Sequence, residues 1–296
     1  MISYPPAAAS SSRRDVSSPL EKTNKPAASP HWDKAARKGF FTAAATIVFL
    51  LFYLPSALGL NWQEAKDTHF IVYHYKEDNE FAKNVLRGSE SHYQSIPGRL
   101  GLSQSFSFWT WENRVKIYIY PDRATFLEQT ESQGWSRAIA NYRTKVISFY
   151  KGSDEASFLN TTLPHELTHL LFREFVGVNS QLPVWVDEGA AQLMEEGKAN
   201  KAMSSIKELL GTDYFISVDT LMRLDIRRVR EKELVTIFYL ESCALLDFLI
   251  KNYGGSEFER FCKKISEGKT FEEAFATSYS SAEELNKRWI EYIKQF

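Results

Sequence analysis

The stretch LPHELTHLLFREF, residues 163–175, places two histidines four residues apart with a glutamate directly after the first. On an α-helix, residues at i and i+4 lie one turn apart on the same face, so His165 and His169 point toward one place. Neutral imidazole is a good zinc ligand, and a catalytic zinc uses three protein ligands plus water. Glu166 flanks the pair and can reach a water molecule at the metal without binding the metal itself. The stretch therefore predicts a zinc-binding helix with a general base beside it.

The third ligand distinguishes between families of zinc enzymes. A metzincin would continue with glycine at 172 and histidine at 175, but both positions are phenylalanine. The other option is a glutamate on a following helix, and LPVWVDEGAAQLMEE (182–196) supplies Glu188. Eighteen residues separate His169 from Glu188. They include a turn, VGVNSQLP (176–183), which lets the second helix fold back beside the first.

HExxH, eighteen residues and then W-x-x-E-G-x-A resembles the gluzincin pattern of zinc peptidases. The flanking text TLPHELTHLLF, LPVWVDEGAAQLMEE and FYLESCALLDFLIKNYGG is similar to the peptidase MA-like domains of bacteria. This resemblance covers about residues 64–296. It implies one zinc ion held by His165, His169 and Glu188, with Glu166 as general base.

The resemblance also implies further roles. A tyrosine on a downstream helix would stabilise the oxyanion, and Tyr239 in FYLESCALL has a similar context, although a tyrosine packed in the core is an equal alternative. Substrates of this clan lie antiparallel to an edge strand just before the motif helix. VISFY (146–150) occupies that place, so the backbone around Ile147, Ser148 and Phe149 is predicted to hold substrate; the alternative is an inner strand.

Other polar residues near the motif are candidates for supporting roles. Histidine ligands usually donate their second N–H to an acceptor, and Glu195 is a candidate for it, one to two turns past Glu188. Thermolysin-like proteins often carry an aspartate four residues after the ligand glutamate, where this chain has Gln192. Glu174 lies five residues past His169 and is expected to point away from the shared face.

The N-terminal part of the chain predicts that this domain lies outside the cytoplasm. Residues 1–38 are rich in Ser, Pro and Ala and predict a disordered cytoplasmic tail. Residues 39–60 include 21 uncharged residues from Phe40 to Leu60, preceded by Lys34, Arg37 and Lys38, which predicts a single transmembrane helix with the C-terminal part outside. A cleaved signal peptide followed by secretion is the alternative, and a buried core helix in a cytosolic enzyme is a third interpretation.

The chain beyond Asn61 reads as an α+β domain. A small mixed β-sheet lobe at 61–155 is predicted to precede a mainly helical lobe at 156–296, with the zinc site at their junction. Strands are expected at 69–75, 114–122 and 145–152, with helices at 79–101 and 123–130 between them. The later helices are expected at 156–176, 186–198, 201–210, 233–253, 256–266, 271–277 and 281–295. Cys243 and Cys262 match no metal pattern and are either one disulfide or two buried thiols.

Together these features predict a membrane-anchored zinc metallopeptidase that acts on peptides or proteins. The G-x-M-E-N stretch of the aminopeptidases is absent, which favours an endopeptidase. The net charge of -1 and the lack of a long basic face argue against a nucleic-acid partner. The sequence does not define an oligomeric state. The alternative function is a catalytically weak or inactive domain used as a binding or scaffold module, although an intact Glu166 argues against it.

Overall fold

All residues whose structure is described belong to one compact unit that spans residues 58–296. The computed structural model describes residues 61–103, 108–130, 137–152 and 154–296. The predicted tail at 1–38 and the predicted membrane helix at 39–60 lie outside these ranges. Within them, no helix is both long enough and apolar enough to cross a bilayer.

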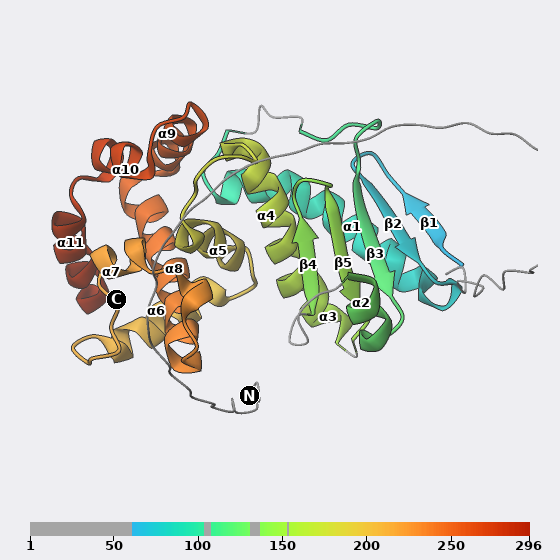
Figure 1. Ribbon diagram of the computed structural model, residues 1–296, viewed down its shortest axis with the longest axis horizontal. Helices are drawn as coiled ribbons and strands as arrows, with labels where there is room; N and C mark the ends of the chain where they lie inside the picture. Colours follow the sequence, from blue (N-terminus) through green and yellow to red (C-terminus); the bar gives the residue numbers. More distant parts are fainter. Residues whose placement is uncertain (1–60, 104–107, 131–136, 153) are drawn as a thin grey trace, which may run out of the picture. The chain divides into compact units, whose positions relative to one another are not determined.

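A five-stranded mixed sheet forms the first part of this unit (Figure 1). Its strand order is β1-β2-β3-β5-β4. The three central strands are parallel, and the strand at each edge runs antiparallel to its neighbour. Their bounds are β1 (Gln63–Lys66), β2 (Phe70–His74), β3 (Val115–Tyr120), β4 (Ala138–Asn141) and β5 (Val146–Tyr150).

Alternating apolar residues explain how the central strands pack. The parallel register places Val72 opposite Ile117, and Ile117 opposite Ile147, so these buried side chains share one face of the sheet. Helix α1 (Asn79–Arg99) packs against β2 and contributes buried residues such as Phe81, whose ring makes an edge contact with Phe149. The sequence therefore predicts the sheet core from a period of two.

Helices make up almost all of the chain after the sheet. The prediction of a small mixed sheet followed by a helical part is confirmed. The helix predicted at 186–198 ends five residues early, and a separate helix begins at Lys198. The edge strands β1 and β4 and the short helix Val218–Arg223 were not predicted. The helices are α2 (Arg123–Thr130), α3 (Glu155–Ser157), α4 (Leu163–Val176), α5 (Val184–Leu193), α6 (Lys198–Leu209), α7 (Val218–Arg223), α8 (Lys232–Tyr253), α9 (Gly255–Ser266), α10 (Phe271–Tyr279) and α11 (Ala282–Gln295).

Helix α4 lies between the sheet and the helical part. It contacts β4 and α1 on one side and α5 and α9 on the other (Figure 1). A π-helical turn, Phe158–Thr162, runs directly into its first turn. Pro164 is the second residue of α4, a first-turn position at which proline is tolerated. The HExxH motif thus lies at the junction of the two parts.

The two cysteines are buried and not bonded to each other. Cys243 lies within α8 and Cys262 within α9. Burial raises the pKa of the Cys243 thiol to about 12, and it also raises the pKa of Cys262. Both therefore behave as apolar core residues rather than as reactive thiols.

Candidate metal centre

Two histidines from one face of α4 meet at the centre of the site. The Nε2 atoms of His165 and His169 are 3.2 Å apart, as expected of side chains one helical turn apart. Both side chains are partly buried, with about one sixth to one fifth of their surface exposed. The apolar face of α4, which includes Leu167 and Leu170, is buried in the core and fixes the direction of the imidazoles.

Helix α5 brings Glu188 to the same place. Its Oε2 atom lies 3.7 Å from Nε2 of His165 and 3.8 Å from Nε2 of His169. One ligand atom from each of the three residues lies within 4.8 Å of the other two. The adjacent Gly189 allows α5 to press against α8, since a Cβ atom at that position would come 2.5 Å from the Ser242 carbonyl oxygen.

The spacing of these three atoms fits a tetrahedral zinc ion. Zinc–nitrogen and zinc–oxygen bonds of about 2.0–2.1 Å place neighbouring ligand atoms about 3.3 Å apart in a tetrahedron. The observed separations of 3.2, 3.7 and 3.8 Å are close to that value. Small side-chain rotations would suffice to complete the coordination.

Two carboxylates outside the triad fix the imidazole rings. The Nδ1 atom of His165 lies 2.9 Å from Oε1 of Glu195, and that of His169 lies 3.2 Å from Oδ1 of Asp187. An ionised carboxylate only accepts, so each Nδ1 atom donates its proton to the carboxylate beside it. The two Nε2 atoms, 3.2 Å apart and with the Glu188 carboxylate beside them, are therefore the imidazole atoms that would bind a cation in place of a proton.

The electrostatics of the cluster also favour positive charge. Burial opposes a charge on His169, but the carboxylates of Asp187, Glu188 and Glu166 outweigh it and raise its pKa to about 10. Burial raises the pKa of Asp187, but His169 and Arg173 hold it below its usual value. Arg173 makes this pairing rigid through contacts of 3.0 Å and 2.6 Å from Nε and Nη2 to Oδ2 of Asp187.

Glu195 is also held ionised, although it lies outside any helix. Burial raises its pKa, but His165 and Lys198 more than offset this and lower it overall. The sequence places Glu195 on the helix of Glu188. In the structure α5 ends at Leu193, and Glu195 lies in the turn before α6.

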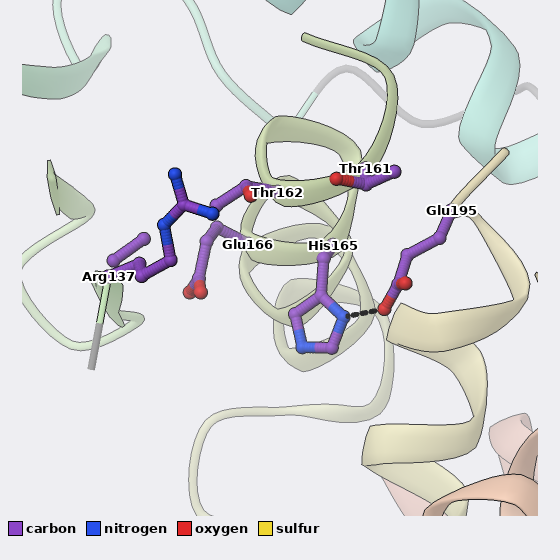
Figure 2. Close-up of a pocket in the computed structure, with 7 residues that line it drawn as sticks. Arg137, Thr161, Thr162, His165, Glu166 and Glu195 are labelled. Carbon is purple, nitrogen blue, oxygen red and sulfur yellow. Dashed lines mark hydrogen bonds and ion pairs between the residues drawn. The ribbon is translucent and has the colours of Figure 1, made fainter. Parts of the chain in front are cut away.

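Glu166 faces a cavity of about 260 Å³ beside the metal ligands (Figure 2). His165, Glu195 and the side chains of Thr161 and Thr162 also line it, and Arg137 and Ala138 form the facing wall. Glu166 is absent from the triad whose ligand atoms converge, and it lies on the cavity side of α4. This geometry leaves its carboxylate able to hold a water molecule or to transfer a proton.

The other polar candidates have different environments. Glu174 points away from the site as predicted, because it pairs with Lys145 Nζ at 2.7 Å and accepts from Trp109 Nε1 at 3.4 Å. Gln192 is buried, and its Oε1 has no hydrogen-bond partner among the described residues. It therefore does not support either histidine.

Tyr239 lies on α8 and is partly buried against the core. It is one turn before Ser242, whose carbonyl oxygen faces Gly189 in the middle of α5. It is not one of the described residues that line the cavity. Its catalytic role remains a prediction.

The prediction that β5 holds substrate through its backbone is wrong. Ile147, Ser148 and Phe149 lie on an inner strand that pairs with β3 on one side and β4 on the other. Their backbone groups are committed to the sheet, and their side chains are buried. The edge strand nearest the motif helix is β4, which contacts α4.

Sequence reasoning did not find Asp187, Arg173 or Arg137. Asp187 directly precedes Glu188, and Arg173 lies four residues after His169, so both residues are close to the motif in the sequence. Their pairing depends on how α4 and α5 are rotated against each other, which neither helix pattern reveals. Arg137 comes just before β4, a strand too short to recognise from AIAN.

A sheet followed by helices, with HExxH on the helix at the junction and a facing glutamate on the next helix, defines a metallopeptidase-type domain. A family model described as Peptidase MA superfamily matches residues 109–295, more than half of the chain. The chain therefore belongs to the peptidase MA superfamily, and the resemblance seen in the motifs is confirmed.

Comparison with solved structures gives a similar chain in a structure of yeast LTA4 hydrolase in complex with bestatin. The two are 14% identical with a TM-score of 0.44. The match covers 76% of this chain and 37% of that protein, so this chain spans well under half of its length. No curated protein sequence matches this chain.

Proposed function

We propose that this protein is a zinc-dependent peptidase in which His165, His169 and Glu188 bind one zinc ion. The convergence of their three ligand atoms, with carboxylates fixing both imidazoles, is the observation that carries this proposal. When bound, zinc supplies a Lewis acid that polarises a carbonyl and lowers the pKa of water to about 7.

The chain's own residues then account for proton transfer. Glu166 faces the cavity beside His165, where its carboxylate takes a proton from the attacking water and passes it to the leaving amine. The hydroxyl of Tyr239 would donate to the oxyanion that develops on the substrate carbonyl. Glu195 and Asp187 keep the imidazoles in the tautomer that leaves Nε2 free.

Substrate would add as an antiparallel strand beside β4, the edge strand of the described sheet. This strand begins at Ala138, which lines the cavity. Main-chain pairing of this kind holds many sequences with little side-chain preference. With the absent G-x-M-E-N stretch, it supports an endopeptidase that acts on peptides or proteins.

The proposed location is the cell membrane, with the peptidase domain on the extracytoplasmic side. The uncharged run from Phe40 to Leu60 and the basic residues before it support this placement. Membrane fractionation and protease protection of the full chain in cells would test it. Release of the full-length protein by salt alone would contradict anchoring, and recovery of a shortened chain in the medium would indicate a cleaved signal peptide.

The activity is tested on the detergent-solubilised full chain. We expect one zinc ion per chain by elemental analysis, and cleavage of casein that stops when a chelator is added. Glu166→Gln should keep the zinc and reduce turnover at least about 100-fold, because general acid–base catalysis contributes 10²–10⁴-fold. Glu174→Gln is the matched control, since Glu174 lies on the same helix but faces Lys145.

Three other outcomes would contradict part or all of this proposal. Unchanged turnover in Glu166→Gln would remove this residue from the mechanism. A folded protein that binds zinc but cleaves no peptide would support the scaffold alternative. A folded protein that binds no divalent metal would refute the metal centre itself.

A further inference from the structure

Arg137 is the cationic side chain on the wall of the cavity that faces the HExxH helix. It comes immediately before β4 and shares the cavity with His165 and Glu166 (Figure 2). The other ionisable groups among the described lining residues are His165 and two carboxylates, Glu166 and Glu195. Arg137 therefore supplies the permanent positive charge among the described residues that line this cavity.

The guanidinium group of Arg137, whose side chain is exposed, lies close to the backbone of a glycine. A Cβ atom at Gly152 would come 2.8 Å from Nη2 of Arg137, so the guanidinium lies against this glycine, two residues beyond β5. Within the described part of the chain, no carboxylate forms an ion pair with Arg137. Glu195, the other acid of the cavity, is already paired with His165 and Lys198. Among the described residues, no carboxylate therefore occupies the donors of this guanidinium.

The direction of a bound peptide determines what Arg137 meets. This step rests on the proposed function, including antiparallel pairing of substrate with β4. Such a peptide runs from the Asn141 end of β4 toward the Ala138 end, where His165 and Glu166 lie. The residues after the scissile bond then leave the strand past Ala138 and reach Arg137.

We propose that Arg137 selects substrates with a carboxylate on the C-terminal side of the scissile bond. The planar guanidinium donates two parallel hydrogen bonds to a carboxylate, a fit that a neutral amide does not share. An acidic side chain and the terminal carboxylate of the peptide offer the same chemistry. The first would give an endopeptidase with acidic preference, and the second an enzyme that trims C-termini.

Four matched fluorogenic peptides separate these sources. They carry glutamate or glutamine after the scissile bond, each with a free or an amidated C-terminus. In the zinc-loaded full chain we expect kcat/KM to be about tenfold higher for one carboxylate form than for its neutral partner, the size of one charge-assisted hydrogen bond. Arg137→Gln should abolish this ratio, and Arg137→Glu should reverse it.

Arg143→Gln is the matched control, because Arg143 is exposed beyond the other end of β4 and contacts Asn179. It removes the same charge and should leave the ratio unchanged. A second readout uses fluorescence anisotropy of the labelled peptides bound to Glu166→Gln, which does not require turnover. The Kd ratio between acid and amide forms should again be about tenfold and should disappear in Arg137→Gln/Glu166→Gln.

The outcomes distinguish this inference from the proposed function. Chelator-sensitive cleavage with no carboxylate preference would overturn the role of Arg137 alone. An equal loss on all four peptides in Arg137→Gln would also overturn it, because the arginine would then not discriminate between acid and amide. A folded, zinc-loaded protein that cleaves none of the peptides and does not cleave casein would overturn the proposed function, and the inference with it.

Discussion

The Nδ1 atom of His165 lies 2.9 Å from Oε1 of Glu195, a residue in the turn that follows α5. Arg99, at the end of α1, fixes that turn. Its Nη2 and Nη1 atoms donate to the carbonyl oxygens of Leu193 and Met194, both at 3.1 Å. The orientation of one imidazole on α4 thus depends on three other elements, because α1 holds the end of α5 and the turn holds the ring.

This contact predicts that Glu195 tunes metal affinity. Glu195→Gln removes the negative charge while keeping an oxygen acceptor, so the imidazole becomes less basic and its tautomer less fixed. We expect zinc affinity to fall about tenfold or more, since loss of such a partner costs 10–100-fold. Competition with a chromogenic chelator at constant pH measures the change.

Glu196→Gln provides the control for Glu195. It removes the same charge one residue further on, where the side chain is exposed and the backbone N–H bonds to Asn160 O. Equal losses of zinc affinity in the two variants would mean that only the net charge of the turn matters, and not the contact with His165.

The close approach of α5 and α8 predicts that Gly189 cannot accept even a methyl group. In Gly189→Ala the new Cβ would lie 2.5 Å from a backbone oxygen of Ser242, which cannot rotate away. We expect a loss of about 1–3 kcal/mol in urea unfolding of the metal-free protein, together with weaker zinc binding because Glu188 is adjacent.

Gly88→Ala on α1 is the comparison, since its Cβ would meet only the Leu163 and Leu159 side-chain methyl groups at 3.3 Å and 3.6 Å. Helix propensity favours alanine there by about 1 kcal/mol, so this variant should be near neutral or slightly more stable. Wild-type stability in Gly189→Ala would show that the two helices can separate without cost.

Tyr239 yields a prediction that separates catalysis from packing. Tyr239→Phe keeps the ring against the core and removes the hydroxyl. If that hydroxyl donates to the oxyanion, kcat should fall about 10²–10³-fold while zinc content and KM stay unchanged. Tyr253→Phe, at the end of α8 where the hydroxyl meets Arg288, serves as control. Unchanged kcat in Tyr239→Phe would assign this residue to the core.

The parts of the fold that repeat a pattern were predictable from sequence. Helix α4 and strands β2, β3 and β5 follow from periods of 3.6 and 2, and the ligand triad follows from its spacing. Strand β4 could not be predicted in this way, because it has only four residues and two of them are alanines, which have a low β-propensity. Missing it moved the predicted substrate edge onto β5, which made the roles of Ile147, Ser148 and Phe149 wrong.

The supporting carboxylates illustrate a second limit. Glu195 was a candidate because it follows Glu188 at a plausible distance, but its place beyond the end of α5 depends on Arg99, 96 residues earlier. Asp187 was visible beside Glu188, but only the rotation of α5 against α4 brings it to His169. Such contacts depend on tertiary packing. The local sequence pattern could therefore suggest candidate carboxylates but could not show which of them contacts a histidine.

Glu241 is a fully buried carboxyl on α8, away from the metal ligands in sequence and outside the cavity wall. Neither of its oxygens makes a hydrogen bond of standard geometry with a described residue. Burial raises its pKa to about 8, and the nearby Ile216 backbone and Trp289 side chain lower it only partly. The folded protein therefore keeps this carboxyl protonated at neutral pH.

This carboxyl predicts that stability falls as the pH rises. Between its ordinary pKa of about 4.5 and the folded value of about 8, the native state retains a proton that the unfolded chain releases. The free energy of unfolding should therefore decrease across this window, by at most about 1.4 kcal/mol per pH unit from this group.

Glu241→Gln mimics the protonated form, so its free energy of unfolding should rise steadily relative to that of the wild type from pH 5 to pH 8. Urea unfolding with excess chelator measures this, with exposed Glu291→Gln as control. Parallel curves for wild type and Glu241→Gln would mean that the buried carboxyl titrates at its ordinary pKa.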